Sequence, residues 1–251
     1  ERMVQIGVDH LARIDASPWA PPVAWFEVGT PAKPLGEGKE PIKHRLLDGY
    51  LPVDTVTTVR SGVKYELAIF GWSKGFTPEA DMYTYVKIKA TPGKGAKLPK
   101  QLLMGYNSKD GEKRSTWKMT RSGQSSEVYL RFKHPEPETA KAVTAADFKG
   151  KQSEVVAYWK AKLKPAERLY MPDKRVREAY RAWLVYSFLN AAKLNGYLEI
   201  HDGSGFYGSM FGQSMTLHAV AMDLYGLPKY SERIIDTMLH YQHEDGLYFQ
   251  D

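Results

Sequence analysis

The sequence contains no cysteine, no long apolar run and little excess charge. Without cysteine, the chain forms no disulfide, offers no thiol nucleophile and holds no zinc through thiolates. The most apolar run, at residues 182–189, is far shorter than the roughly 18–20 residues of a membrane-spanning helix, so no membrane span is expected. The chain begins at Glu1 without a basic-then-apolar leader, so we expect any signal peptide to have been removed already.

A chain without cysteine is compatible with reducing and with oxidising compartments. The sequence therefore does not identify the compartment, and a periplasmic or secreted location is among the alternatives. The net charge is +6, from 35 Lys and Arg against 29 Asp and Glu. The basic residues between positions 87 and 121 are scattered along turns and alternating strands, whereas a nucleic-acid binder gathers them on one face. We interpret them as solvated surface and expect no nucleic-acid partner.

The first 150 residues follow the two-residue period of β-strands. Two such runs, residues 53–59 and 63–70, are separated by Ser61-Gly62 and predict a hairpin. Further strands are expected at residues 82–90, 102–106, 115–120 and 127–133. Short strands with closely spaced turns predict an antiparallel β-sandwich over residues 1–150. Within it, residues 17–41 hold six of the fifteen prolines and are expected to be irregular.

Helical periodicity follows a polar connection at residues 134–150. Residues 152–163 predict a short helix within a helical linker, residues 151–172. A second helix is expected from Asp173, a potential N-cap, to the Asn195-Gly196 pair. Its predicted apolar stripe comprises Val176, Ala179, Tyr180, Trp183, Leu184, Phe188, Ala191 and Ala192.

Two more helices are expected in the last part of the chain. The helix at residues 209–225 is predicted to turn one face inward, comprising Leu217, Val220, Ala221 and Leu224. The helix at residues 231–242 is predicted to bury Ile234, Ile235, Met238 and Leu239. Residues 173–251 are therefore predicted to be a series of antiparallel helical hairpins.

The loop between the second and third predicted helices has the densest functional signal. Four glycines, Gly203, Gly205, Gly208 and Gly212, allow the backbone to approach a ligand closely and open into a helix N-terminus. Flat aromatic faces beside hydrogen-bonding groups are typical of a sugar site. The candidate residues for sugar contact are Asp202, Phe206, Tyr207, Met210, Phe211 and Gln213. The alternative is a glycine-rich turn whose aromatic side chains are simply buried.

Two other patterns in this region have simpler explanations. The run Gly203-Ser-Gly205-Phe-Tyr-Gly208 fits the dinucleotide motif, but no buried apolar strand precedes it, so no cofactor is expected. His240, His243 and Glu244 have the spacing of metal ligands. Histidines in the last turn of a helix also interact favourably with its dipole, so we expect no metal.

Glycoside hydrolysis usually needs two carboxyl groups on opposite sides of the substrate. Glu199 and Asp202 are close neighbours in one loop, as are Glu244 and Asp245. Neighbours of this kind rarely flank a substrate, so we interpret them as loop or capping acids. The sequence pattern therefore identifies no catalytic residue.

Three stretches of the chain resemble the six-hairpin glycosidases, the glucoamylase-like clan whose catalytic domain is an (α/α)6 toroid. They are residues 46–53 (Leu-Leu-Asp-Gly-Tyr-Leu-Pro-Val), residues 157–163 (Ala-Tyr-Trp-Lys-Ala-Lys-Leu) with the helix after them, and residues 205–226. The order of sandwich, linker and helical hairpins also matches. The resemblance implies an α+β multidomain fold, with a β-sandwich followed by an incomplete toroid.

In that clan, loops at the N-terminal ends of the inner helices form the substrate funnel. The resemblance therefore places Phe206, Tyr207, Met210, Phe211 and Gln213 at a sugar subsite. Related enzymes often carry a Trp and then an Asp in this loop, where this chain has Phe211 and Gln213. Gln213 hydrogen-bonds hydroxyls without carrying charge.

The resemblance implies acid/base cleavage of a glycosidic bond in an oligosaccharide or glycoside. This chain would supply substrate-binding surface, with the catalytic carboxylates coming from a second chain or a downstream segment that completes the toroid. Two alternatives stay open. One is a carbohydrate phosphorylase of similar architecture, and the other is a non-catalytic glycan-binding protein.

Overall fold

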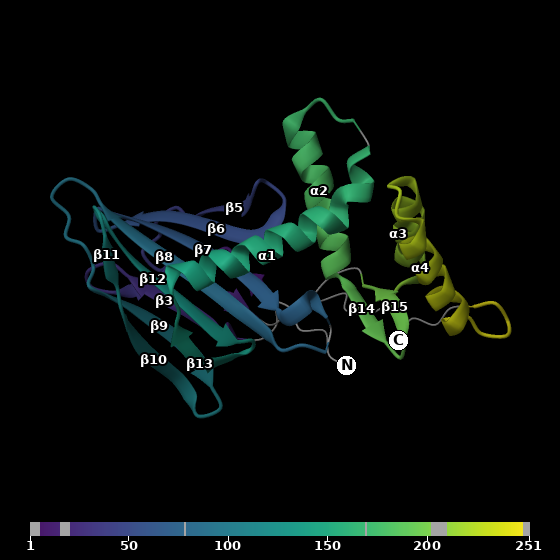
Figure 1. The fold of residues 1–251 in the computed structure, drawn as a ribbon. Coiled ribbons are helices and arrows are strands. Elements are labelled where there is room, and N and C mark those ends of the chain that lie inside the picture. The colour runs from purple at the N-terminus through teal and green to yellow at the C-terminus, as the bar shows by residue number, and fades with distance from the viewer. Residues whose placement is uncertain (1–5, 16–20, 78, 169, 202–209, 248–251) are drawn as a thin grey trace. The chain divides into compact units, whose positions relative to one another are not determined.

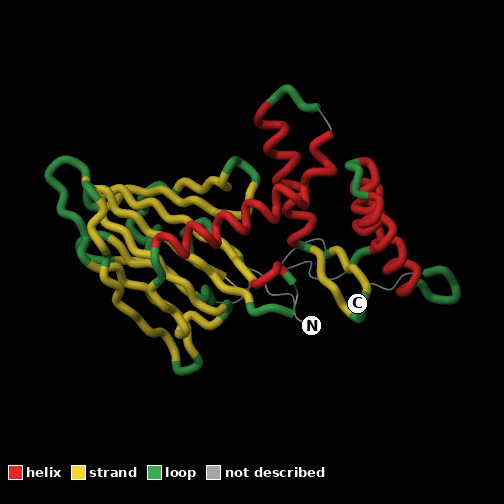
Figure 2. The backbone as a smooth tube through the Cα atoms, in the orientation of Figure 1, coloured by secondary structure: helices red, strands yellow, loops and turns green. Residues whose placement is uncertain are grey.

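The computed structural model describes residues 6–15, 21–77, 79–168, 170–201 and 210–247. In this part of the chain the fold is mixed α+β, with two large antiparallel sheets, a short hairpin and four α-helices (Figures 1 and 2). Two compact units are distinguished, Val4–Val156 and a unit that contains Ala157–Asp251. No helix in the described ranges is both long and apolar enough to cross a membrane.

One sheet of the first unit has six strands. Its order is β1 (Gly7–Val8), β2 (Ile14–Asp15), β3 (Ala24–Val28), β9 (Gln101–Ser108) and β10 (Gly111–Lys118), with β4 (Lys33–Pro34) paired to β3. At its edge, β10 exposes most of its side chains, Lys113 and Arg114 among them. Charged side chains on an edge strand discourage pairing with another chain.

The second sheet has seven strands and contains the predicted hairpin. Its order is β11 (Thr120–Ser122), β12 (Ser125–Lys133), β8 (Met82–Pro92), β7 (Val63–Ser73), β6 (Leu51–Arg60) and β5 (Lys43–Leu47), with β13 (Glu136–Ala142) paired to β12. Strands β6 and β7 pair from Arg60↔Val63 onward. Ser61 and Gly62 both have positive φ, 51° and 73°, as a two-residue hairpin turn of this kind requires.

The two sheets share one apolar core. Phe26 and Met104 of the six-stranded sheet belong to the same buried cluster as Val56, Leu67 and Ile88 of the seven-stranded sheet. In β7 and β12 of the seven-stranded sheet, buried side chains alternate with more exposed ones along much of each strand, as the two-residue period predicts. The coarser prediction, an antiparallel β region in the first half of the chain joined to a helical region, is confirmed.

Two connections predicted to lack structure contain strands. Residues 17–41 include β3, a fully buried central strand of the six-stranded sheet, because the prolines flank its apolar run without interrupting it. Residues 134–150 include β13 and the start of helix α1 (Ala145–Leu163). Thr144 is the N-cap of α1, because its Oγ1 accepts a hydrogen bond from Asp147 N (3.1 Å).

The first part of α1 packs on the seven-stranded sheet through an aromatic cluster. The Phe148 ring lies 5.1 Å from Phe70 and 5.4 Å from Tyr129, measured between centroids. One helical turn and a half further, Glu154 Oε2 accepts a hydrogen bond from the Trp72 indole (2.7 Å). A short 3-10 helix, η1 (Lys74–Phe76), follows β7.

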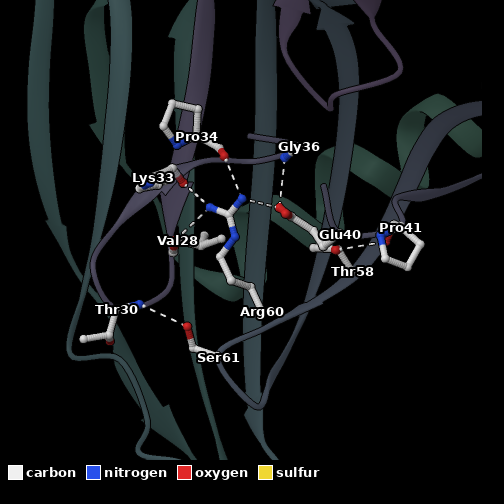
Figure 3. A network of polar contacts seen from close by, with 10 residues as sticks. All are labelled: Val28, Thr30, Lys33, Pro34, Gly36, Glu40, Pro41, Thr58, Arg60 and Ser61. Carbon is white, nitrogen blue, oxygen red and sulfur yellow. Dashed lines mark hydrogen bonds and ion pairs between the residues drawn. The ribbon is translucent and has the colours of Figure 1, made fainter. Parts of the chain in front are cut away.

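Arg60 joins the end of β6 to the segment after β3 (Figure 3). Its guanidinium donates to the carbonyl oxygens of Val28, Lys33 and Pro34 and to the Glu40 carboxylate. These partners all belong to the chain and occupy the guanidinium, so we interpret the network as structural. It holds the proline-containing segment against the sheet.

The second unit begins with the end of α1 and a 3-10 helix, η2 (Lys164–Arg168). Four elements of regular structure follow α2 (Lys174–Leu189): β14 (Ala191–Leu194), β15 (Tyr197–Ile200), α3 (Gly212–Leu224) and α4 (Pro228–Tyr241). The predicted N-cap is confirmed, because Asp173 Oδ1 accepts hydrogen bonds from Arg175 N (2.8 Å) and Val176 N (3.0 Å). Pro228 occupies the first turn of α4, a position that suits proline.

The predicted extension of the second helix to Asn195 is wrong. Helix α2 ends at Leu189, and Ala191 and Ala192 lie in strand β14, paired with β15. Asn195 and Gly196 have φ values of 50° and 91° and form the hairpin turn between the two strands. An Asn-Gly pair is compatible with either a helix end or a hairpin turn, and here the pairing of residues 191–194 with 197–200 decides.

The predicted inward faces of the last two helices are also wrong in part. Helix α3 buries Met215, Ala219 and Met222, whereas Leu217, Val220 and Leu224 are exposed and Ala221 is half-buried. Helix α4 buries Ile234 as predicted but exposes Ile235 and Leu239, and Met238 is half-buried. Helix α3 is apolar around most of its circumference, so its periodicity alone does not select one face.

Candidate functional site

The predicted sugar-binding loop joins β15 to α3. His201 is described before it, and Met210, Phe211 and Gln213 are described after it. Asp202, Phe206 and Tyr207 lie outside the described residues, as do three of the four loop glycines. The candidate site is therefore built from the two ends of the loop and from the elements that hold them.

At the α3 end, Phe211 immediately precedes the helix with an extended backbone (φ −112°, ψ 123°). Its carbonyl accepts the first hydrogen bond of the helix, from Met215 N (2.9 Å). A phenyl side chain has no group that caps a helix, so it does not satisfy the amides of the first turn. Met210 and Phe211 are half-buried and Gln213 is exposed, so a donor and acceptor side chain lies next to an aromatic one.

At the β15 end, Glu199 forms a buried polar cluster with Tyr241 of α4 and with His201. The Tyr241 hydroxyl donates to Glu199 Oε1 at 2.5 Å. His201 Nε2 lies 3.3 Å from Glu199 Oε2. The Glu199 side chain is only 8% exposed, so both contacts form away from bulk solvent, where they are stronger than at a surface.

The β14–β15 hairpin and α4 position this cluster together. Register pairs Glu199 with Ala192 across the hairpin. Thr237 of α4 fixes the helix on the strand, because its Oγ1 accepts a hydrogen bond from Leu198 N (3.0 Å). The Tyr197 and His240 rings stack with centroids 3.8 Å apart, which adds a second contact between β15 and α4.

Asn190 is joined to His201 of the cluster through the backbone. Its backbone oxygen accepts a hydrogen bond from His201 N (3.1 Å), so the two residues are adjacent across the hairpin base. The Asn190 side chain belongs to a residue that is 2% exposed, and its Nδ2 has no hydrogen-bond partner among the described residues. A buried amide nitrogen without a partner costs free energy unless something satisfies it.

The hydrogen bond to Glu199 changes the acidity of Tyr241. Because the hydroxyl donates to a carboxylate, and because it is partly desolvated, the pKa of Tyr241 rises to about 12. Tyr241 therefore remains a hydrogen-bond donor to Glu199 throughout the neutral range. Carboxylate and imidazole groups held together in this way can accept hydrogen bonds from hydroxyl groups and donate to them.

The other candidate residues have structural partners. His240 stacks on Tyr197, and His243 N donates to Leu247 O (2.9 Å). Within the described ranges, no group of three His, Asp or Glu side chains is placed to hold a metal ion. His218 Nδ1 lies 2.9 Å from Ser214 O, and its ring stacks on Trp183 at 5.8 Å between centroids.

Comparisons of this chain with family models, with curated proteins and with solved structures found no match.

The sequence predicts the loop as the candidate site but not the residues at its base. Its pattern favours a loop or capping role for Glu199 and does not single out Asn190 or Tyr241. The Asn195-Gly196 pair, flanked by short alternating runs, was the available signal for the hairpin that buries Glu199. Nothing in the sequence pattern indicated that Tyr241 would meet Glu199, since 42 positions separate them.

Proposed function

We propose that this chain is the substrate-binding part of a carbohydrate-active hydrolase built like the six-hairpin glycosidases. The observation that carries the proposal is the buried Glu199–Tyr241–His201 cluster. It lies at the base of the loop that carries the predicted sugar residues. Tyr241 and His201 are the partners that offset the cost of burying the Glu199 carboxylate, and they fix its orientation. Its position beneath an aromatic and glycine-rich loop supports a role in recognition.

A sugar requires two kinds of contact from such a site. Its hydroxyl groups need acceptors and donors, which Glu199 and Asn190 supply at the base of the loop and Gln213 at its far end. Its C–H faces pack on aromatic rings, for which Phe211 is the described candidate and Phe206 and Tyr207 are the predicted ones. The proposed substrate is an oligosaccharide or a glycoside.

We assign Glu199 to binding and not to catalysis. Tyr241 donates to one of its oxygens and His201 approaches the other, so the carboxylate is held in place and is not open to a leaving group. In the proposed reaction, a general acid protonates the glycosidic oxygen while a second carboxylate acts as base or nucleophile. Both belong, in this proposal, to a second chain or a further segment.

The proposal includes the toroid. Helices α2, α3 and α4 would be its first helices, and α3 and α4 would form one of its hairpins. The exposed apolar side chains of these helices, such as Leu217 and Leu224, support further helices packing against them.

Isothermal titration calorimetry with a panel of neutral oligosaccharides tests the proposal. We expect one member to bind, and Glu199→Gln to weaken binding about tenfold or more, because a hydrogen bond to a charged group contributes roughly 1.5–3 kcal/mol. Gln213→Ala and Tyr207→Ala are expected to weaken it several-fold with little change in melting temperature. Gln124→Ala, an exposed glutamine in the β11–β12 turn, is the control.

Two results would count against saccharide recognition, and a third would change the type of reaction. If no oligosaccharide of the panel binds, the recognition role is wrong. If Gln213→Ala or Tyr207→Ala unfolds the protein, the loop is a buried structural turn. Release of a sugar phosphate that requires inorganic phosphate, once the missing helices are supplied, would assign the chain to a phosphorylase.

A further inference from the structure

A polar pocket lies between the segment before α2 and the first turns of that helix. It has a volume of about 290 Å³ and is lined mainly by Glu167, Tyr170, Met171, Arg177, Tyr180 and Arg181. Arg177 and Arg181 are four residues apart on α2, so their side chains extend from the same face of the helix. The pocket therefore contains two side chains that remain positively charged at every physiological pH.

The Arg177 guanidinium has hydrogen-bond donors to spare. Its Nη1 donates to Met171 O (2.8 Å), which fixes the half-buried side chain against the segment before the helix. Its Nε and Nη2 donate to no residue in the described part of the chain. A guanidinium held in this way can bind an oxyanion through two N–H groups at once.

Arg181 has a carboxylate partner inside the pocket. Its Nη2 lies 3.0 Å from Glu167 Oε1, and the two side chains are 24% and 42% exposed. A partly exposed pair of this kind is weak, so an entering anion can compete with Glu167 for the guanidinium. Tyr225, which follows α3, packs edge-on against Tyr180 with ring centroids 4.8 Å apart and adds no charge to the pocket at neutral pH.

Positive charge is in excess around the pocket. Residues 164–181 contain six Lys and Arg against three Asp and Glu, which is half of the excess of the whole chain. Each of the three acids already has a partner. Asp173 caps α2, Glu178 lies 3.6 Å from Lys174, and Glu167 pairs with Arg181. The excess is therefore not cancelled by neighbouring carboxylates of this segment.

The position of these cations in the helix is unfavourable. The first turn of α2 contains Lys174, Arg175 and Arg177 and no acidic residue. Cations near a helix N-terminus oppose the helix dipole and lower the stability of the helix. Natural sequences accept such local conflicts chiefly at functional sites. An anion bound beside Arg177 would offset this repulsion.

We propose that this pocket binds a phosphate group, either as inorganic phosphate or as the phosphomonoester of a small molecule. Arg177 donates to it through Nε and Nη2, and Arg181 adds its charge as Glu167 gives way. A phosphate carries up to two negative charges near neutral pH and has several acceptor oxygens, so it matches two guanidinium groups better than a carboxylate does. The pocket is close in volume to the smallest small-molecule sites, which leaves room for an organic group.

This inference does not depend on carbohydrate binding. Arg177 lies 12 residues before the end of α2 at Leu189, which is about 18 Å along the helix axis. The Glu199 cluster and the predicted sugar loop follow that far end of α2 in the chain.

Isothermal titration calorimetry of the full chain at low salt tests the proposal with inorganic phosphate, a hexose 6-phosphate and glucuronate. We expect both phosphates to bind, and glucuronate to bind at least about tenfold more weakly. Tighter binding of the hexose phosphate would identify a phosphomonoester as the ligand, and equal affinities would identify free phosphate. Bound phosphate is also expected to raise the melting temperature of the chain.

Variants of the chain locate the binding. Arg177→Gln is expected to lower the phosphate affinity about tenfold or more, and Arg177→Lys to lower it less, because lysine keeps the charge but not the paired donors. Glu167→Gln is expected to raise the affinity several-fold, since it removes the competing carboxylate, and a folding defect would not produce such a gain. Arg233→Gln is the control, because Arg233 is an exposed arginine of α4 outside the pocket.

Four results would overturn the inference. They are no binding of either phosphate at millimolar concentration, glucuronate binding as tightly as phosphate, an equal loss of affinity in the Arg233 control, and no gain of affinity in Glu167→Gln. Oligosaccharide binding is measured in parallel and is expected to be unchanged in Arg177→Gln. The phosphate site and the saccharide site can therefore fail independently of each other.

Discussion

At the scale of single residues, buried polar groups set the local stability of this protein. Arg60 and Glu40 have side chains only 10% and 7% exposed, and Arg60 also binds three backbone carbonyls. Lys64 and Glu66 on β7 form a comparable pair, but their side chains are 47% and 40% exposed. The same kind of ion pair therefore occurs once buried and once exposed, and the contribution of the pair to the free energy of unfolding is expected to differ between the two sites.

Arg60→Met is expected to lower the free energy of unfolding by about 3–5 kcal/mol, because it leaves the buried Glu40 carboxylate without its counter-ion. Lys64→Met is the matched control and is expected to cost less than about 1 kcal/mol, as exposed pairs do. Urea unfolding followed by circular dichroism measures both. Equal costs would show that the Arg60 network contributes no more than a surface pair.

The same pair predicts a dependence on acid. Burial alone would raise the pKa of Glu40, but hydrogen bonds from Arg60 and from Gly36 N–H outweigh it and hold the pKa below its ordinary value. A lowered carboxyl pKa contributes stability above the ordinary carboxyl range and loses it as the pH falls through the lowered value. Arg60→Met should therefore also flatten the decline of stability with acid, which unfolding curves across that range would measure.

Tyr241 gives the opposite sign at high pH. Its pKa is raised to about 12 by the hydrogen bond to Glu199, so its contribution to stability is complete below the ordinary tyrosine pKa. That contribution is lost as the pH rises from about 10 through the raised value. An ultraviolet absorbance titration of the chain minus that of Tyr241→Phe should show one tyrosine ionising near pH 12. A difference curve centred near pH 10 would contradict the Glu199–Tyr241 hydrogen bond.

At the scale of elements, pattern alone predicted the long strands and the helix start at Asp173. Residues 53–59 and 63–70 alternate clearly and form β6 and β7 with the expected turn. The β3 strand was not predicted, because prolines lie on both sides of its apolar run. The β14–β15 hairpin was not predicted, because an Asn195-Gly196 pair is also compatible with the end of a helix. The exposed face of α3 could not be predicted, since a helix apolar on most sides gives no preference.

Two glycines within regular elements are expected to change the stability in opposite directions when each is replaced by alanine. A Cβ on Gly105 of β9 would lie 2.2 Å from the Trp25 indole, so Gly105→Ala should cost about 1–3 kcal/mol through overpacking. Gly150 in α1 has open space around it, so Gly150→Ala should stabilise the protein by roughly 0.5–1 kcal/mol. Chemical denaturation of both variants measures the difference. A harmless Gly105→Ala would show that Trp25 does not occupy that face of the strand.

At the scale of the whole molecule, the chain combines a β unit with an exposed helical unit. The first, Val4–Val156, has a closed core shared by two sheets. The second, containing Ala157–Asp251, holds the loop ends and the Glu199 cluster, and several of its helices expose large apolar side chains. Function is therefore proposed for the second unit, where the buried Asn190 Nδ2 has no hydrogen-bond partner among the described residues and several helices expose large apolar side chains.

The central claim is that the end of the loop at α3 contacts a saccharide. The direct measurement is a nuclear magnetic resonance spectrum of the chain with ¹³C-labelled methionine methyl groups, in which Met210→Leu identifies the Met210 signal. A saturating oligosaccharide is predicted to shift the half-buried Met210 signal and to leave that of Met104, inside the β core, unchanged. An unmoved Met210 signal in the presence of a bound oligosaccharide would contradict the account.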